Sequence, residues 1–321
     1  MRSIPLNAIA LTLLKEFGLA FLLLLGVSFV VFAILYAAPG DQFSVLLEGQ
    51  LPTEEVRAGI REAIGIAPSW YGQYLSWLMN VLSGNFGTSV RTGLPVAGEL
   101  FNVSLNTLYL TLGSMAVTLL IAVPIALYSS VRGHSVMISW PLTMLGYIIS
   151  ALPVFWLAYI AIYISIHSFD FFPLASMSQE QGGNSWLYTL VPVLVLGLGS
   201  GTISEVIRSL REEMSRVMAE DYVRTARAKG ASVWRHAFKE GLLLPVTEII
   251  ASKIPFMLGG AVIVEQIFNW PGMGRMAWQA AQDRDFPVIM GIALVAAAFV
   301  RMGSLLQRIV CTAVNPQRAR D

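Results

Sequence analysis

The stretch FGLAFLLLLGVSFVVFAILYAA, residues 17–38, contains 22 residues and no charged side chain. A helix that crosses a lipid bilayer needs about 20 consecutive, mostly apolar residues. The stretch is therefore predicted to form a membrane-spanning helix. A cleaved signal peptide would have a shorter apolar core and a cleavage site of small residues, so we expect this first span to be retained.

Five further apolar runs follow along the chain. Of the 321 residues, 55% are hydrophobic and only 13% are charged, which is less charge than a soluble domain carries. Six runs predict an all-α membrane protein with six transmembrane helices. Pro141 and Pro153 are expected to kink or split the third span. The five later runs are residues 103–131, 136–166, 181–204, 242–268 and 286–306.

The distribution of Lys and Arg sets the predicted orientation, because basic residues are enriched in the cytoplasmic loops of membrane proteins. With the N-terminus in the cytoplasm, the cytoplasmic segments hold 15 of the 21 Lys and Arg residues. We therefore expect both termini and a loop at about residues 208–241 to be cytoplasmic. We expect residues 1–102 to form the first span and an external segment with short helices at 53–64 and 71–82. Residues 103–321 are expected to form a five-helix core.

Other classes of protein fit the sequence less well. Lys and Arg (21) nearly balance Asp and Glu (20), so charge does not indicate nucleic-acid binding. A membrane-embedded enzyme would need convergent ionisable groups, but four of the six predicted spans are charge-free. The three histidines have no metal-ligand spacing, Cys311 has no second cysteine to pair with, and no G-x-x-x-x-G-K-[ST] phosphate loop occurs. A receptor or scaffold with a signalling loop is the alternative to a transport subunit.

A short polar stretch, EDYVRTARAKG at residues 220–230, lies in the predicted cytoplasmic loop. Asp221 is a suitable N-cap and Gly230 can adopt the left-handed conformation that ends a helix, so a helix is predicted over residues 222–229. Such a helix is about 12 Å long and too short to be stable alone in water. It is either a capped connector or a docking element for a partner, and the caps alone do not decide between them.

Charged residues interrupt the fifth apolar run, among them Lys253 and Glu265. Charges inside a membrane usually face a cavity or a partner. Lys253 is expected either to pair with a carboxylate or to line a translocation pathway. Glu265 and the following turn, which includes Trp270 at the membrane interface and Gly272, are candidates either for part of an external gate or for a conformationally demanding turn.

Seven motifs between residues 35 and 316 carry a family resemblance. They are LYAAPGD (35–41), QYLSWLMNVLSGNFGTSVRTGLPV (73–96), LNTLYLTLGS (105–114), SALPVFWLAY (150–159), DYVRTARAKG followed by LLLP (221–230, 242–245), FNWPGMGRMAWQAAQDRDFPV (268–288) and VNP (314–316). In this order they resemble the permease subunits of ATP-binding cassette (ABC) importers of the dipeptide, oligopeptide and nickel branch. Ala226 and Gly230 hold the Ala and Gly positions of that family's EAA…G…LP pattern, whereas Arg224 and Thr225 replace its Glu and first Ala.

The resemblance implies the type I ABC importer permease fold, with six transmembrane helices and a cytoplasmic coupling helix. As partners it implies a second, different permease chain, two cytoplasmic ATPase subunits that bind ATP and magnesium, an external solute-binding protein and membrane lipid. This chain itself is expected to have no catalytic activity, cofactor, metal or nucleic-acid partner. Its expected location is a bacterial inner membrane.

The resemblance also implies that the short polar helix docks in a cleft of an ATPase. Tyr222 and Ala226 are expected to make buried contacts there, and Arg224, Arg227 and Lys229 to form charge pairs. The expected docking residues are Asp221, Tyr222, Val223, Arg224, Ala226, Arg227, Lys229 and Gly230. The expected cargo is a di- or oligopeptide, with nickel or another metal chelate, glutathione or an opine as the alternative.

Overall fold

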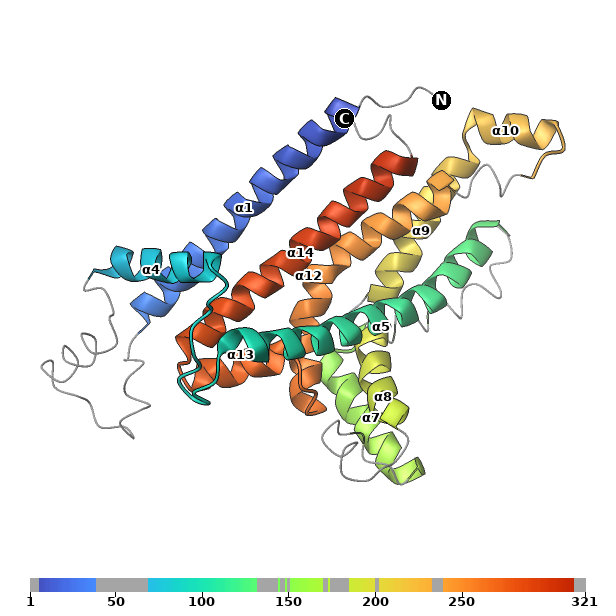
Figure 1. Cartoon of the computed structure of the whole chain (residues 1–321). Helices are drawn as coiled ribbons and strands as arrows, with labels where there is room; N and C mark the ends of the chain where they lie inside the picture. Colours follow the sequence, from blue (N-terminus) through green and yellow to red (C-terminus); the bar gives the residue numbers. More distant parts are fainter. Residues whose placement is uncertain are drawn as a thin grey trace, which may run out of the picture. The chain divides into compact units, whose positions relative to one another are not determined.

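The computed structural model describes residues 6–38, 69–131, 144, 148, 151–169, 173, 185–199, 202–232 and 239–314 (Figure 1). Within these ranges the regular elements are helices, and an isolated antiparallel bridge joins Thr88 to Pro95. The predicted all-α character is therefore confirmed for the described residues. The helix predicted at residues 53–64 lies outside them.

The chain divides into two compact units. The first comprises Met1–Asn106 and Pro271–Phe299, and the second comprises Thr107–Trp270 and Val300–Asp321. The first unit therefore contains a segment from the predicted five-helix core in addition to the N-terminal part.

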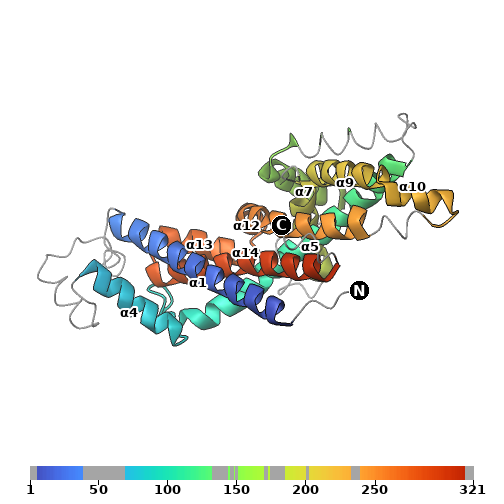
Figure 2. The same cartoon turned by 90° about the horizontal axis from the view of Figure 1, so that it is seen from above.

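The first unit contains α1 (Leu6–Ala37), α4 (Trp70–Leu82) and α13 (Met273–Gln282), with the beginnings of α5 (Val96–Val131) and α14 (Phe286–Val314). Helix α4 begins after Ser69, whose extended backbone lets its Oγ accept a hydrogen bond from Gly72 N–H at 3.3 Å. This confirms the short helix predicted at residues 71–82. Helices α1 and α4 lie against each other in both views (Figures 1 and 2).

Three described helical segments are long and apolar enough to cross a membrane: Lys15–Ala37, Val96–Tyr128 and Phe286–Ile309. They correspond to the first, second and sixth predicted spans. Two bent helix pairs raise the number of candidate spans among the described residues to five if each pair is one span. The described residues thus form a helical protein with several segments long and apolar enough to span a membrane.

The second bent pair corresponds to the fifth predicted span, whereas the first begins in the fourth, residues 181–204, and continues into the predicted cytoplasmic loop. The first joins α8 (Ser185–Leu198) to α9 (Thr202–Met218), and its two halves meet at 55°. The second lies within α12 (Leu244–Ile267) and bends by 53° next to Pro255. Proline has no backbone N–H and its ring clashes with the preceding turn, so a bend at this position has a local cause.

The third predicted span is represented by α7 (Val154–Phe169), which has 16 residues. It begins directly after Pro153, where the backbone leaves the helical conformation at Leu152. Proline disfavours the α-conformation of the residue before it, which explains the break. The predicted effect of Pro153 is confirmed, whereas Pro141 lies outside the described residues.

The core of the second unit forms where α5, α8 and α12 cross. A Cβ atom on Gly197 would lie 2.7 Å from the carbonyl oxygen of Ser114, so only glycine permits this approach of α8 to α5. Thr118 Oγ1 also donates a hydrogen bond to Gly197 O at 2.7 Å. Around this crossing lie the buried residues Leu110, Leu196, Met257, Ala261, Val264 and Phe268.

Helix α9 packs on the same unit through a single apolar stripe. Its buried side chains recur at the three- and four-residue spacing of an amphipathic helix, and they contact α5 through Ala122 and Ala126 and α12 through Ile249. The opposite face of α9 is polar and exposed. The stripe consists of Ile203, Val206, Ile207, Leu210, Met214 and Val217.

Candidate functional site

The polar stretch around residue 225 forms a separate short helix, α10 (Asp221–Ala228), which projects from the end of α9 (Figures 1 and 2). The helix predicted at residues 222–229 is therefore present. Its N-cap, however, is Glu220 rather than Asp221, and the Glu220 side chain makes no capping hydrogen bond. Glu220 adopts the extended conformation of a cap, which makes Asp221 the first helical residue and leaves its side chain in solvent.

The C-terminal end of α10 is closed as the sequence predicts. Gly230 has φ +67°, the left-handed conformation. The N–H of Ala231 donates to Ala226 O at 2.9 Å, and the N–H of Gly230 donates to Arg227 O at 3.1 Å. This pair of bonds is the Schellman motif, which satisfies carbonyls that the helix end would otherwise leave unpaired.

One face of α10 is buried within the chain itself. Val223 is fully buried and packs with Met214 and Val217 of α9, and Ala226 is also buried. The predicted partner contact Ala226 therefore faces inward. Tyr222, the other predicted buried contact, is 37% exposed. Because α10 is too short to be stable alone, this apolar anchor explains how it is held.

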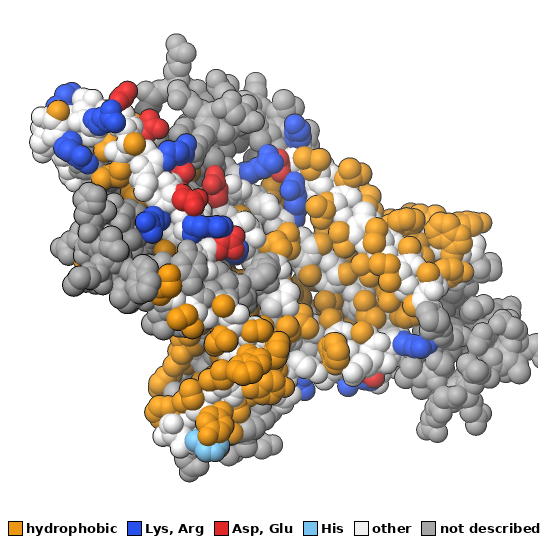
Figure 3. Space-filling view, turned by 180° about the vertical axis from the view of Figure 1, so that it is seen from behind, with side chains coloured by type: hydrophobic (Ala, Val, Ile, Leu, Met, Phe, Trp, Pro, Cys, Tyr) orange, Lys and Arg blue, Asp and Glu red, His pale blue; other side chains and the backbone are white. Residues whose placement is uncertain are grey.

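The outward face of α10 is charged. The Arg224 guanidinium lies 3.7 Å from the Asp221 carboxylate, and these side chains are 71% and 97% exposed. Arg227 and Lys229 are exposed as well. In the space-filling view, Lys, Arg, Asp and Glu side chains gather over α9 and α10, whereas hydrophobic side chains cover α7 and α8 (Figure 3).

The chain returns toward α12 through a π-helical turn, η2 (Lys239–Leu243), which packs against α9. A Cβ on Gly241 would lie 3.0 Å from the Sδ of Met214. The same Met214 contacts Val223 of α10. Helices α9 and α10 and the turn η2 thus share one small core. Gly241 is not among the predicted site residues, and its only signal in the sequence is its position just before the LLLP motif.

The two intramembrane charges singled out from the sequence both have partners. Lys253 Nζ forms an ion pair with Glu205 in the first turn of α9. Glu265 is completely buried, and its Oε1 accepts a hydrogen bond from Thr107 Oγ1 at 2.7 Å. The expected pairing of Lys253 with a carboxylate is therefore found, which favours that alternative over lining of a pathway.

Trp270 is buried in the core of its unit, and its expected position at a membrane interface stays a prediction. It is 9% exposed and packs in the core with Val264 and Phe268. Asn269 adopts φ +53°, and Trp270 N–H donates to Glu265 O at 2.8 Å. This left-handed turn folds Trp270 back onto the helix that precedes it. In the first unit, Gly272 is buried and precedes α13 as its N-cap.

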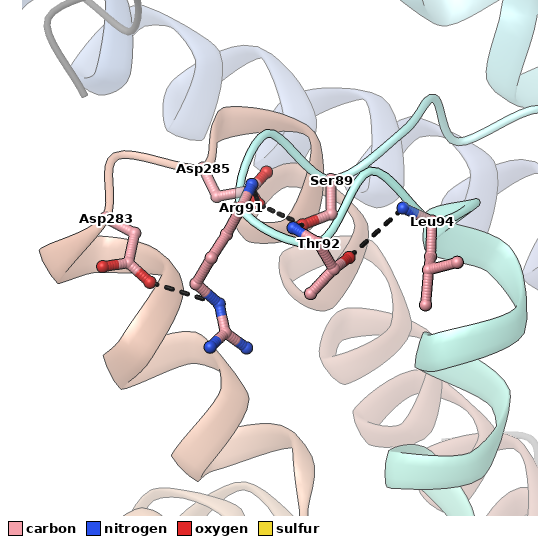
Figure 4. A network of polar contacts seen from close by, with 6 residues as sticks. All are labelled: Ser89, Arg91, Thr92, Leu94, Asp283 and Asp285. Carbon is pink, nitrogen blue, oxygen red and sulfur yellow. Dashed lines mark hydrogen bonds and ion pairs between the residues drawn. The ribbon is translucent and has the colours of Figure 1, made fainter. Parts of the chain in front are cut away.

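A polar network holds the turn between α4 and α5 against the corner between α13 and α14 (Figure 4). The sequence did not predict this network. Ser89 Oγ donates to Asp285 Oδ2 at 2.5 Å, and Arg91 N–H donates to the same oxygen at 3.3 Å. Arg91 Nε also lies 3.3 Å from Asp283 Oδ2. Asp285 is 2% exposed, so this carboxylate fixes the loop from inside. These residues lie far apart in the sequence, so their spacing does not predict that they meet.

Several apolar helices long enough to span a membrane, together with the polar helix α10 between α9 and α12, are typical of a multi-pass membrane protein. The model of the family "Binding-protein-dependent transport system inner membrane component" matches residues 122–320, and the N-terminal model of the same component matches residues 10–122. The chain belongs to this family, whose members are permease subunits of ABC transporters.

Curated relatives match over nearly the whole chain. The oligopeptide transport system permease protein AppB of Bacillus subtilis is 36% identical over 303 residues, which cover 92% of this chain and 95% of AppB. The glutathione transport system permease protein GsiC of Salmonella typhimurium is 31% identical, covering 91% and 94% of the two chains. The dipeptide transport system permease protein DppB of Escherichia coli is 27% identical, covering 95% and 97%.

Proposed function

We propose that this chain is one of two different permease subunits of an importer that moves di- or oligopeptides across a bacterial inner membrane. An external solute-binding protein delivers the cargo, and two cytoplasmic ATPases bind ATP and magnesium and drive the cycle. In this proposal the chain has six transmembrane helices, both termini lie in the cytoplasm, and α10 is the coupling helix.

The observation that carries the proposal is the two-sided construction of α10. Val223 and Ala226 fix the helix to its own chain, while Asp221, Arg224 and Arg227 are exposed. A helix held by one face, with charges on the other, is suited to transmit the movement of a partner, because a force on its outer face reaches α9 directly.

The contacts around α10 suggest the route of that movement. Met214 contacts Val223 and lies against Gly241 of the turn η2, and η2 leads directly into α12. Helix α9 is also joined to α12 by the Lys253–Glu205 ion pair. A displacement of α10 would therefore act on α9 and α12 together, which makes these helices the two-state element of the transporter.

The residues considered above as candidates for a gate or a translocation pathway have different roles in this proposal. Lys253 and Glu265 hold helices together through Glu205 and Thr107, and Trp270 is part of the packed core. We assign them a positioning role. Gly272, where α13 begins, stays a candidate for the gate because glycine, which has no Cβ, permits a wider range of backbone angles at this N-cap.

Peptide cargo is supported by the relatives named for oligopeptides and dipeptides. Glutathione is the second candidate, because relatives named for glutathione are similarly close, at 31% identity. A deletion strain complemented with this chain and its neighbouring genes, and tested for uptake of labelled dipeptide, pentapeptide, glutathione, nickel chelate and opine, separates these cargoes. Uptake of none of the peptides would contradict the assignment.

Docking is tested by purifying the tagged chain from solubilised membranes and identifying the retained proteins by mass spectrometry. The test variant carries Arg224→Glu and Arg227→Glu on the outward face of α10. The matched control carries Arg208→Glu and Arg211→Glu, two exposed charge reversals on the neighbouring α9. Substitutions at Val223 or Ala226 are unsuitable here, because they would disturb the anchor itself.

We expect the wild type and the α9 control to retain two ATPases and a second permease chain. The α10 variant should lose the ATPases and keep the second permease. If the wild type retains no ATPase, or if the α10 variant retains as much as the control, α10 is not the coupling helix.

A further inference from the structure

Helix α4 has a composition that does not suit a segment in water. Its sequence, WYGQYLSWLMNVL, contains no charged residue in 13 positions. Four of the 13 are Trp or Tyr: Trp70, Tyr71, Tyr74 and Trp77. These two residue types are enriched where a protein crosses the boundary between hydrocarbon and lipid headgroups.

One face of α4 is packed against α1. The Tyr74 hydroxyl lies 2.9 Å from Ser28 Oγ and donates to Leu25 O at 3.4 Å. The Tyr74 ring meets Phe29 edge-on, with centroids 5.5 Å apart, and lies 5.3 Å from Phe32. These contacts fix the position of α4 along α1.

That position is deep along the first span. The apolar segment of α1 runs from Lys15 to Ala37, and Ser28 lies near its middle. Nine residues of helix separate Ser28 from Ala37, which is about 13 Å along the axis. Because the hydrocarbon core of a bilayer is about 30 Å thick, a helix whose tyrosine reaches Ser28 lies at the level of one leaflet.

A second face of α4 is apolar and exposed. Tyr71, Leu75, Met79 and Leu82 are 59%, 55%, 71% and 63% exposed. With 100° between successive residues, these four side chains fall on one side of the helix. A third, narrower face is polar and consists of Gln73, Ser76 and Asn80, and no described contact between helices covers the apolar side.

We propose that α4 is embedded in the membrane, with its apolar face against the acyl chains of one leaflet and its polar face toward the headgroups. The occupant of the apolar face is lipid because α4 is fixed to α1, a candidate spanning helix in whose most apolar stretch only 11% of the residues are buried. A water-facing protein partner would be expected to meet some charge, and α4 has none. In the topology proposed above, this leaflet is the outer one.

The arrangement gives α4 a function in the membrane. An amphipathic helix lying in the interface plane resists displacement along the membrane normal, since its apolar face and its polar strip each need their own medium. Through Tyr74, α4 therefore fixes the depth and tilt of α1. The loop that follows α4 starts from this anchored helix and reaches the Ser89–Asp285 network.

Site-directed spin labelling distinguishes the possible environments of α4. In a chain carrying Cys311→Ser, the substitutions Leu75→Cys and Met79→Cys place a nitroxide on the apolar face, and Ser76→Cys and Asn80→Cys place it on the polar face. All four positions are exposed, so the labels need not disturb packing. The full complex is reconstituted in phosphatidylcholine–phosphatidylglycerol vesicles, and collisions with oxygen and with a soluble nickel chelate are measured.

Lipid exposure gives frequent collisions with oxygen and few with nickel. We expect an oxygen-to-nickel collision ratio several-fold higher at residues 75 and 79 than at residues 76 and 80. Frequent nickel collisions at 75 and 79 would show that the face lies in water, and low values for both reagents would show that protein covers it. Either result overturns the proposal without affecting the coupling role of α10, which depends on ATPase recovery.

Discussion

Helices α10 and α4 are both short and are both anchored by one face, but their free faces differ in chemistry. Each is anchored by one face: α10 by Val223 against α9, and α4 by Tyr74 against α1. The free face of α10 is charged, whereas that of α4 is apolar and aromatic. The anchor therefore determines where a short helix is held, and the free face indicates whether protein in water or lipid surrounds it.

The anchors themselves differ in chemistry. That of α10 is aliphatic and depends on the exclusion of water from a small cluster. That of α4 combines aromatic packing with hydrogen bonds from one hydroxyl. Because lipid supplies no hydrophobic driving force between helices, polar and edge-to-face contacts suit a helix in the membrane. The following substitutions test this difference.

The largest effect is expected from Val223→Asp, which would place a carboxylate in the cluster formed with Met214 and Val217. An unpaired buried charge costs roughly 3 kcal/mol or more, which exceeds what holds so short a helix. We expect α10 to detach, the amides of residues 221–230 to lose protection from hydrogen exchange, and ATPase recovery to disappear.

The control for this change is Ala228→Asp, which introduces the same carboxylate at an exposed position of the same helix. It should leave amide protection unchanged. Equal loss of protection in both variants would mean that Val223 is not the anchor of α10.

An intermediate effect is expected from Gly230→Ala. A Cβ at Gly230 would meet no atom within 4 Å, so the cost arises only from φ +67°. An L-residue in the left-handed conformation costs roughly 1–2 kcal/mol, and exchange in the last turn of α10 should accelerate accordingly. Gly98→Ala is the matched control, because Gly98 also has free space but lies in α5 without a positive φ. That change should be neutral or slightly stabilising.

A smaller effect is expected from Tyr74→Phe. The substitution keeps the aromatic contacts with Phe29 and removes the hydroxyl that meets Ser28 and Leu25 O. Loss of such a bond costs about 1 kcal/mol, which should lower the apparent Tm of the purified chain in detergent by a small, measurable amount. Tyr71→Phe, on the exposed face of the same helix, should leave the Tm unchanged. If both tyrosines behave alike, the hydroxyl of Tyr74 does not anchor α4.

The sequence predicted α10 well in its existence and its ends, because caps and left-handed glycines depend on neighbouring residues. It assigned Ala226 to a buried contact with the partner, whereas the structure buries this residue within the chain. Val223 and Ala226 turn inward because α9 presents Met214 and Val217 to them, and that choice depends on tertiary packing. The same reason explains the one-residue error at the N-cap, since Glu220 belongs to the turn that leads out of α9.

The polar contacts show a second limit of prediction from sequence. Lys253 and Glu265 were recognised as residues that need partners, yet Glu205 and Thr107 lie 48 and 158 positions away. Spacing rules reach only a few residues along a helix. The burial of Trp270 was likewise not predicted, because it depends on the left-handed turn at Asn269 that folds the side chain into the core. The apolar runs, by contrast, depend on composition alone, and three of the predicted spans match single helices.

The smallest effect on stability is expected from Arg224→Ala. The ion pair with Asp221 is exposed and its charges are 3.7 Å apart, and such surface pairs contribute little to folding. We therefore expect an unchanged Tm together with reduced ATPase recovery. Arg216→Ala is the control, because Arg216 also pairs with a carboxylate three residues earlier, Glu213 on α9, through a closer two-nitrogen contact away from the outward face of α10. Loss of ATPase from the Arg224 variant alone, with an unchanged Tm, would show that the charge serves the partner. Equal recovery in both variants would move the docking contact to Tyr222 and leave the charges of α10 as a solvated surface.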